Sequence, residues 1–201
     1  MLDTMNQPQG TYHHGDLRRA ILDAAERRLV AGGIETVTIR GCARDAGVSA
    51  AAPVHHFGSL KGVLSALAAR GFGQLVARLD ADLAARDRPG AAVLVGAYVA
   101  FAVASPRMFD LMWREDVLNP DDVDLARARR IALERLRAQS QPPTVEGEAR
   151  VRSIRIWSLA HGLATLLLHG RIVTALGGAG TGLATSADFV ALAYDAEFSE
   201  R

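Results

Sequence analysis

The feature that most constrains the fold of this chain is the helical spacing of its apolar residues, which recurs along nearly the whole sequence. Near the start, Leu17, Ile21 and Leu29 fall on one face of a helix. No segment shows a convincing strand pattern. Aromatic residues make up only 5% of the chain, whereas the strong helix formers Ala and Arg are abundant. The sequence therefore predicts an all-α fold.

Glycine and proline residues divide this pattern into about nine helices. Gly32 and Gly33 are expected to end the first helix, and Pro142 and Pro143 to close a polar amphipathic helix. The expected helices are Asp16–Ala31, Ile39–Ala46, Ala50–Phe57, a long helix from Ser59 toward Arg86, Pro89–Ser105, Pro106–Trp113, Pro120–Gln139, Val145–Leu168 and Ser186–Phe198.

Length and charge suggest how these helices are grouped. A chain of 201 residues, 49% of them apolar, can bury one sizeable core or two small ones. We predict a flexible arm over residues 1–15, a three-helix domain over 16–70 and a larger helical domain over 71–201. Residues 1–70 contain eight Lys/Arg against six Asp/Glu, and residues 71–201 contain fifteen against sixteen. This basic excess is too slight to establish a nucleic-acid partner by itself.

Several classes of protein are disfavoured by composition. Cys42 is the single cysteine, so a disulfide framework and a multi-cysteine zinc site are excluded. Residues 1–15 lack the apolar core of a signal peptide, and the apolar run Ala91–Ser105 is too short to span a bilayer. We expect a cytoplasmic protein with no metal, no cofactor and no membrane partner.

The stretch Thr38–Ser59 contains the most informative motif. Two short predicted helices flank Gly47-Val48-Ser49, and a short turn containing glycine is typical of a helix-turn-helix. Gly47 permits a positive φ, while Thr38 and Ser49 are expected to cap the two helices. The spacing alone fits any helical hairpin equally well.

The wider segment from Tyr12 to about Phe72 resembles the N-terminal domain of tetracycline-repressor (TetR) family regulators. The likeness includes YHHGDLRRAILDAAERRLVAGG and TIRGCARDAGVSAAAPVHHFGS. It implies that residues 16–70 form a DNA-binding domain and residues 71–201 an effector-binding and dimerisation domain. The family behaviour it implies is a homodimeric repressor on double-stranded operator DNA, released by a small-molecule effector.

Family roles transfer only to matching positions. Thr38 and Arg40 resemble phosphate contacts, and Phe57 resembles the residue that locks the recognition helix in place. The predicted DNA-binding residues are Thr38, Arg40, Ser49, Ala50, Ala51, Ala52, His55, His56 and Lys61.

Two positions depart from the family pattern and alter the expected contacts. Val54 stands where family members often have a tyrosine. Family members also often have a lysine directly after the cap, whereas here Leu60 occupies that position and Lys61 follows it. With three alanines on the recognition helix, sequence reading would depend on His55, His56, Ser49, backbone contacts and DNA shape.

In the C-terminal part, Trp157, His161 and Gly162 resemble a TetR subgroup named for its Trp-His-Gly pattern, as does Ser105–Trp113. The resemblance implies an effector pocket. The candidate ligand-binding residues are Tyr98, Phe101, Met108, Phe109, Met112, Trp113, Trp157 and His161. From spacing alone, such side chains are more often plain core.

The apolar stripes of Ala149–Leu168 and Ser186–Phe198 are expected to form a homodimer interface. The stripe residues are Ile156, Leu159, Leu163 and Leu167 in the first segment and Phe189 and Leu192 in the second. A two-fold dimer implies a palindromic operator with half-sites about 34–36 Å apart.

Two other classes of function, an enzyme and a protein-binding scaffold, fit the sequence less well. An enzyme is disfavoured because none of the six histidines has a metal-ligand partner at helical spacing, and Gly177–Gly182 follows a helix rather than a strand. A helical scaffold that binds only protein would explain the C-terminal half but gives no reason for the helix-turn-helix.

Overall fold

The computed structural model describes residues 14–87, 90–138 and 146–171. Within these ranges it contains eight α-helices and one short 3₁₀ helix, and no strand, which confirms the all-α prediction. The predicted arm over 1–15 lies almost wholly outside the described residues, and Pro89, Gly177–Gly182 and the predicted last helix, Ser186–Phe198, lie entirely outside them.

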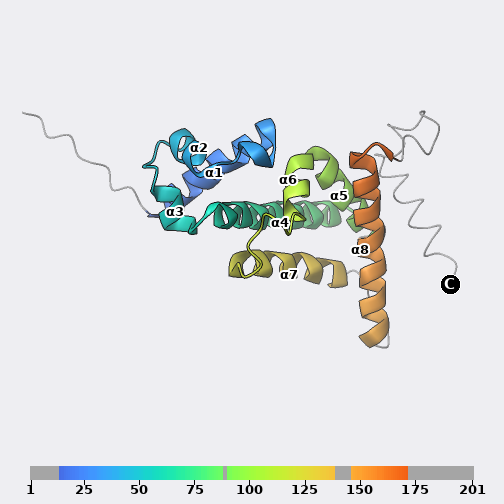
Figure 1. Cartoon of the computed structure of the whole chain (residues 1–201). Helices are drawn as coiled ribbons and strands as arrows, with labels where there is room; N and C mark the ends of the chain where they lie inside the picture. Colours follow the sequence, from blue (N-terminus) through green and yellow to red (C-terminus); the bar gives the residue numbers. More distant parts are fainter. Residues whose placement is uncertain (1–13, 88–89, 139–145, 172–201) are drawn as a thin grey trace, which may run out of the picture. The chain divides into compact units, whose positions relative to one another are not determined.

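Eight of the predicted helices are found with ends shifted by a few residues (Figure 1). They are α1 (His14–Gly32), α2 (Ile39–Asp45), α3 (Ala52–Phe57), α4 (Leu60–Ala84), α5 (Ala91–Ala104), α6 (Pro106–Met112), α7 (Val123–Ala138) and α8 (Glu146–Leu168), with the 3₁₀ helix η1 at Ile34–Thr36.

The chain forms two compact units, divided between Val63 and Leu64, so that α4 begins in the first and continues through the second. In the first unit α1 contacts both α2 and α3. Its buried face carries Ile21, Ala25 and Leu29, each with no exposed surface, at the four-residue spacing that keeps side chains on one side of a helix.

The second unit is centred on the packing of α5 against α8. Ile156, Ala160 and Ala164 follow each other at four-residue intervals on α8 and have no exposed surface. Two small alanines in this row allow a neighbouring backbone to approach closely. Since Ile156 is buried within its own chain, its predicted place in a dimer interface is wrong.

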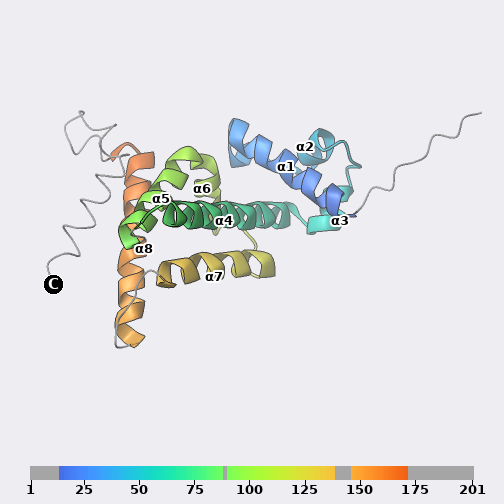
Figure 2. The same ribbon diagram turned by 180° about the vertical axis from the view of Figure 1, so that it is seen from behind.

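Helix α7 lies alongside α4, and α8 crosses both near one end (Figures 1 and 2). An ion pair of 2.8 Å between Arg135 of α7 and Asp80 of α4 joins the two parallel helices. Residues of α4, α5, α7 and α8 enclose a space between them.

No single helix among the described residues is long and apolar enough to cross a membrane. Helices α5 and α6 reach the length and apolar composition of a membrane span only when taken together, and the chain bends by 108° between them.

Candidate DNA interface and effector cavity

The turn between α2 and α3 has the geometry that the sequence predicts. The Thr38 hydroxyl accepts a hydrogen bond of 3.1 Å from the Gly41 N–H, which caps α2. At the other end Gly47 has φ of +68°, a conformation that side-chain-bearing residues rarely adopt. The Val48 N–H then donates to the Ala43 carbonyl at 3.0 Å and closes the turn.

The predicted cap at Ser49 is wrong. Helix α3 begins at Ala52, two residues later than expected, and its N-cap residue Ala51 makes no side-chain hydrogen bond. The Ala52 N–H, which a Ser49 hydroxyl would have capped, donates instead to the Ser49 backbone carbonyl at 3.0 Å. Pro53 is tolerated at this position because the first turn of a helix leaves its N–H groups unpaired in any case.

Arg28 of α1 connects this helix with both η1 and α2. Its guanidinium lies 2.7 Å from Asp45 and donates to the Thr36 carbonyl at 2.9 Å. Gly41 leaves room for it, since a Cβ there would lie 2.5 Å from the guanidinium carbon. The hydrogen bond from Arg28 is the main reason that the pKa of Asp45 lies below its ordinary value.

The junction of α3 and α4 is also fixed locally. Gly58 has φ of +74°, and the Ser59 hydroxyl accepts a hydrogen bond of 3.2 Å from the Gly62 N–H. Phe57 is half-buried, and the Arg18 guanidinium of α1 lies 5.0 Å from the centre of its ring. The predicted lock is therefore an aromatic ring covered by a cation rather than a fully buried core residue.

Most of the predicted DNA-binding residues are exposed, and they come from α2, the turn, α3 and the start of α4. Exposed residues are Thr38, Arg40, Ser49, Ala50, Ala51, His55 and Lys61. His56 is half-buried, with its ring centre 5.3 Å from that of His55. Ala52 is only 8% exposed, which removes it from the accessible surface of α3.

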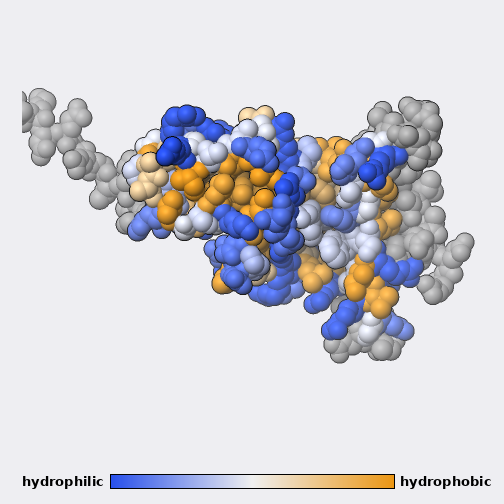
Figure 3. Space-filling view, viewed as in Figure 1, coloured by the Kyte–Doolittle hydropathy of each residue, from blue (hydrophilic) through white to orange (hydrophobic). Residues whose placement is uncertain are grey.

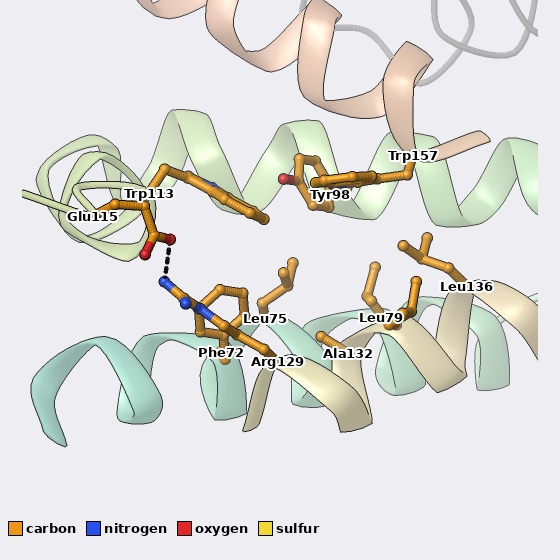
Figure 4. Close-up of a pocket in the computed structure, with 11 residues that line it drawn as sticks. Phe72, Leu75, Leu79, Tyr98, Trp113, Glu115, Arg129, Ala132, Leu136 and Trp157 are labelled. Atoms are coloured by element: carbon orange, nitrogen blue, oxygen red, sulfur yellow. Dashed lines mark hydrogen bonds and ion pairs between the residues drawn. The ribbon is translucent and has the colours of Figure 1, made fainter. Parts of the chain in front are cut away.

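A cavity of about 300 Å³ lies inside the second unit (Figure 4). Tyr98, Trp113 and Trp157 form one side of it, and aliphatic side chains of α4 and α7 form the other. Its full lining is Phe72, Leu75, Leu79, Tyr98, Trp113, Glu115, Arg129, Ala132, Leu133, Leu136 and Trp157.

Three of the predicted ligand-binding residues, Tyr98, Trp113 and Trp157, line this cavity. Phe101, Met108, Phe109, Met112 and His161 do not. The two methionines pack instead against α4 at Gly71, where a Cβ would meet their sulfur atoms at 2.8 and 2.9 Å. Phe109 lies against the Tyr98 and His161 rings, with ring centres 5.7 and 5.5 Å away.

Sequence reasoning missed the side of the cavity that α4 and α7 provide. Phe72, Leu75 and Leu79 are spaced at three and four residues, as are Arg129, Ala132 and Leu136. These stripes were visible in the sequence, but nothing local showed that together they face the aromatic side chains across a space. The ion pair between Arg129 and Glu115, 2.6 Å long, was not foreseen.

Polar atoms gather on the aromatic side of the cavity. The Tyr98 hydroxyl and His161 Nδ1 share a hydrogen bond of 3.0 Å. Burial raises the pKa of Tyr98, and the nearby indoles of Trp157 and Trp113 partly offset that rise. Burial also lowers the pKa of His161, which favours a neutral imidazole. The Tyr98–His161 pair is therefore uncharged at neutral pH.

Two family models match the chain, one in each unit. The family described as "Bacterial regulatory proteins, tetR family" matches residues 21–67. The family described as "Tetracyclin repressor-like, C-terminal domain" matches residues 91–182. The two matches together extend over more than half of the chain.

Solved structures share the same fold. A protein of unknown function from Rhodococcus sp. RHA1 is 30% identical, with a TM-score of 0.71 over 94% of this chain and 97% of that one. A chain from Rhodococcus sp., described as a TetR-family transcriptional regulator, is 18% identical, with a TM-score of 0.62 over 90% and 98% of the two chains.

SmeT, the repressor of the multidrug efflux pump SmeDEF of Stenotrophomonas maltophilia, is 19% identical, with a TM-score of 0.51 over 89% of this chain and 91% of that one.

No curated protein sequence matches this chain. The described residues contain no group of three metal-ligating side chains that could hold an ion.

Proposed function

The chain belongs to the TetR family, whose members are transcriptional regulators and not enzymes, and from that premise we propose that it is a repressor released from a palindromic operator by a small-molecule effector. One observation carries the proposal: a helix-turn-helix with exposed polar residues and an apolar cavity occur in one chain, each in its own compact unit. A scaffold that binds only protein would need neither. The proposal includes the cytoplasmic location and the Trp-His-Gly subgroup expected from the sequence.

In this proposal the exposed turn and α3 enter the major groove. Thr38, Arg40 and Lys61 contact phosphates, because each is exposed and they lie at the first turns of α2 and α4, the helices on either side of α3. His55 and His56 are the donors available to base edges on α3, and Ala50 and Ala51 offer methyl groups to thymine.

Fluorescence anisotropy on the duplex upstream of the protein's own gene tests DNA binding. We expect affinity to fall steeply as salt rises, because phosphate contacts release counterions. His55→Ala should weaken binding about tenfold, whereas His169→Ala, an exposed histidine at the end of α8, should leave it unchanged. Equal affinity of wild type and His55→Ala would exclude His55 as a reading residue.

The homodimer is proposed from exposed apolar surface on α8. Val151, Ile154 and Leu166 are 58%, 53% and 42% exposed, and Figure 3 shows an apolar patch over the N-terminal half of this helix. A contiguous exposed apolar patch on a protein surface often marks a protein–protein interface. Light scattering at micromolar concentration should give the mass of a dimer, and a monomer would overturn this part.

The effector is proposed to occupy the cavity of the second unit. Its volume of about 300 Å³ and its apolar lining with few polar groups are typical of small-molecule sites. Screening metabolites by thermal shift should find a stabilising compound, and the same compound should release the operator duplex. A compound that stabilises the chain without changing DNA affinity would contradict the release mechanism.

A further inference from the structure

One end of the cavity holds hydrogen-bond donors that the described residues leave without acceptors. Nε of Arg129 and Nε1 of Trp113 are both buried, and neither makes a hydrogen bond of acceptable distance and angle. Both groups pack around Phe72, whose ring centre lies 5.5 Å from that of Trp113 and 5.8 Å from the Arg129 guanidinium carbon. The Trp113 indole also lies beside the Tyr98 hydroxyl and has its ring centre 5.7 Å from that of Trp157, so Arg129 Nε is the donor left for a ligand at this end of the cavity.

The remainder of the cavity is almost entirely apolar. Figure 4 shows Leu79, Leu136 and Trp157 away from the Arg129–Glu115 ion pair, with the length of the cavity between them. A ligand lying along this space would have hydrocarbon surroundings over most of its length and polar neighbours at one tip.

Unpaired buried donors cost about 1–3 kcal/mol each, so a ligand that supplies acceptor atoms at that end recovers the difference. Cations are a second class of ligand for such a cavity, because aromatic side chains can bind them. The carboxylate that lines the cavity is Glu115, and it is already paired with Arg129 at 2.6 Å. A cation would meet the guanidinium without an unpaired acid to offset it.

We propose that the cavity binds an amphiphile that has an apolar chain and a single carboxylate, with the carboxylate held by Arg129. The inference rests on the proposed function, in which this cavity is the effector site. The Glu115 side chain is 65% exposed, so it can turn into water when the ligand carboxylate replaces it on Arg129. Ligand binding would then break the ion pair that joins the segment after α6 to α7.

Three probes with the same ten-carbon chain and different head groups test the ligand class: decanoate, 1-decanol and decyltrimethylammonium, each below its micellar concentration. Titration calorimetry on the full chain at neutral pH should give decanoate at least about tenfold tighter binding than decanol. The ammonium compound should bind more weakly than either. Equal or tighter binding of decanol or of the cation would overturn the carboxylate assignment.

A variant of the proposed donor locates the head group. Arg129→Gln should abolish the preference for decanoate over decanol. Arg130→Gln is the matched control, because Arg130 is the next residue of α7, is exposed and pairs with Glu134 at 2.8 Å. Unchanged selectivity in Arg129→Gln would overturn the assignment.

Glu115→Gln keeps the test independent of how well Arg129→Gln folds. It removes the competing carboxylate, so decanoate should bind several-fold tighter while decanol binding stays the same. Weaker decanoate binding in this variant would contradict the replacement of Glu115 by the ligand carboxylate on Arg129.

Release of the operator duplex distinguishes the two proposals. If decanoate binds through Arg129 without changing DNA affinity, the ligand class stands and the effector role of the cavity fails. If none of the probes shows the head-group preference but another compound releases DNA, the effector role stands and the carboxylate class fails.

Discussion

The two units of this chain are organised by interactions of very different range. In the first unit, the bonds that define the motif join residues three to five apart, as from Gly41 to Thr38 and from Val48 to Ala43. In the second, the cavity is assembled from side chains as distant in sequence as Phe72 and Trp157. The first site is a surface fixed by local turns, and the second is an interior created by packing.

This difference shows where each unit tolerates change. The candidate DNA contacts are largely exposed side chains whose removal leaves the helices in place. Most of the apolar residues that line the cavity are also core residues, so their substitution alters binding and stability together. The effects of matched substitutions on stability should therefore be compared between the two units.

The largest effects should come from opening a hole in either core. Ile21→Ala in the first unit and Ile156→Ala in the second each truncate a side chain with no exposed surface. We expect a loss of about 2–5 kcal/mol in each case, because the cavity left behind is only partly filled. Hydrogen exchange should show the loss mainly in the unit that carries the substitution, and equal losses throughout both units would contradict the comparison.

Glycine-to-alanine substitutions should change the free energy of unfolding in opposite directions in the two units. Gly47→Ala places a side chain at φ of +68° and should cost about 1–2 kcal/mol. Gly73 lies inside α4 with open space around its Cβ position, so Gly73→Ala should stabilise by about 0.5–1 kcal/mol. Denaturant melts measure both, and a stabilising Gly47→Ala would show that the turn does not need a left-handed residue.

The capping residues provide a smaller and sharper comparison within the first unit. Thr38→Ala removes the hydroxyl that caps α2 and should cost about 1 kcal/mol. Ser49→Ala should change stability by less than about 0.5 kcal/mol, since its hydroxyl caps no helix. Both are measured without DNA, and a similar loss in the two variants would restore Ser49 as a cap.

The smallest effect should be a pH dependence that originates at Asp45. Its pKa is held below the ordinary value of 3.8 by Arg28, so the pair stabilises the fold above that pH and loses its effect as pH falls through the lowered pKa. The stability difference between wild type and Arg28→Met should therefore shrink on acidification from pH 7 to 3. Arg130→Met, which breaks an exposed pair on α7, serves as the control.

The sequence predicted the helices well because their signals are local. Thr38, Gly47 and Ser59 each act on residues within the next three or four positions, so their roles follow from spacing. The cap at Ser49 failed for the same kind of reason: the Ala52 N–H had a second local acceptor, the Ser49 carbonyl, and spacing cannot choose between them.

By itself, then, the sequence determined the all-α class, eight of the helices and the turn of the DNA-binding motif. Only the tertiary structure decided that Ile156 is buried within the chain, that Met108 and Met112 pack against Gly71, and that α4 and α7 form one side of the cavity. An apolar stripe specifies that a face is buried. What covers that face, and whether a space is left, depends on helices that are distant in sequence.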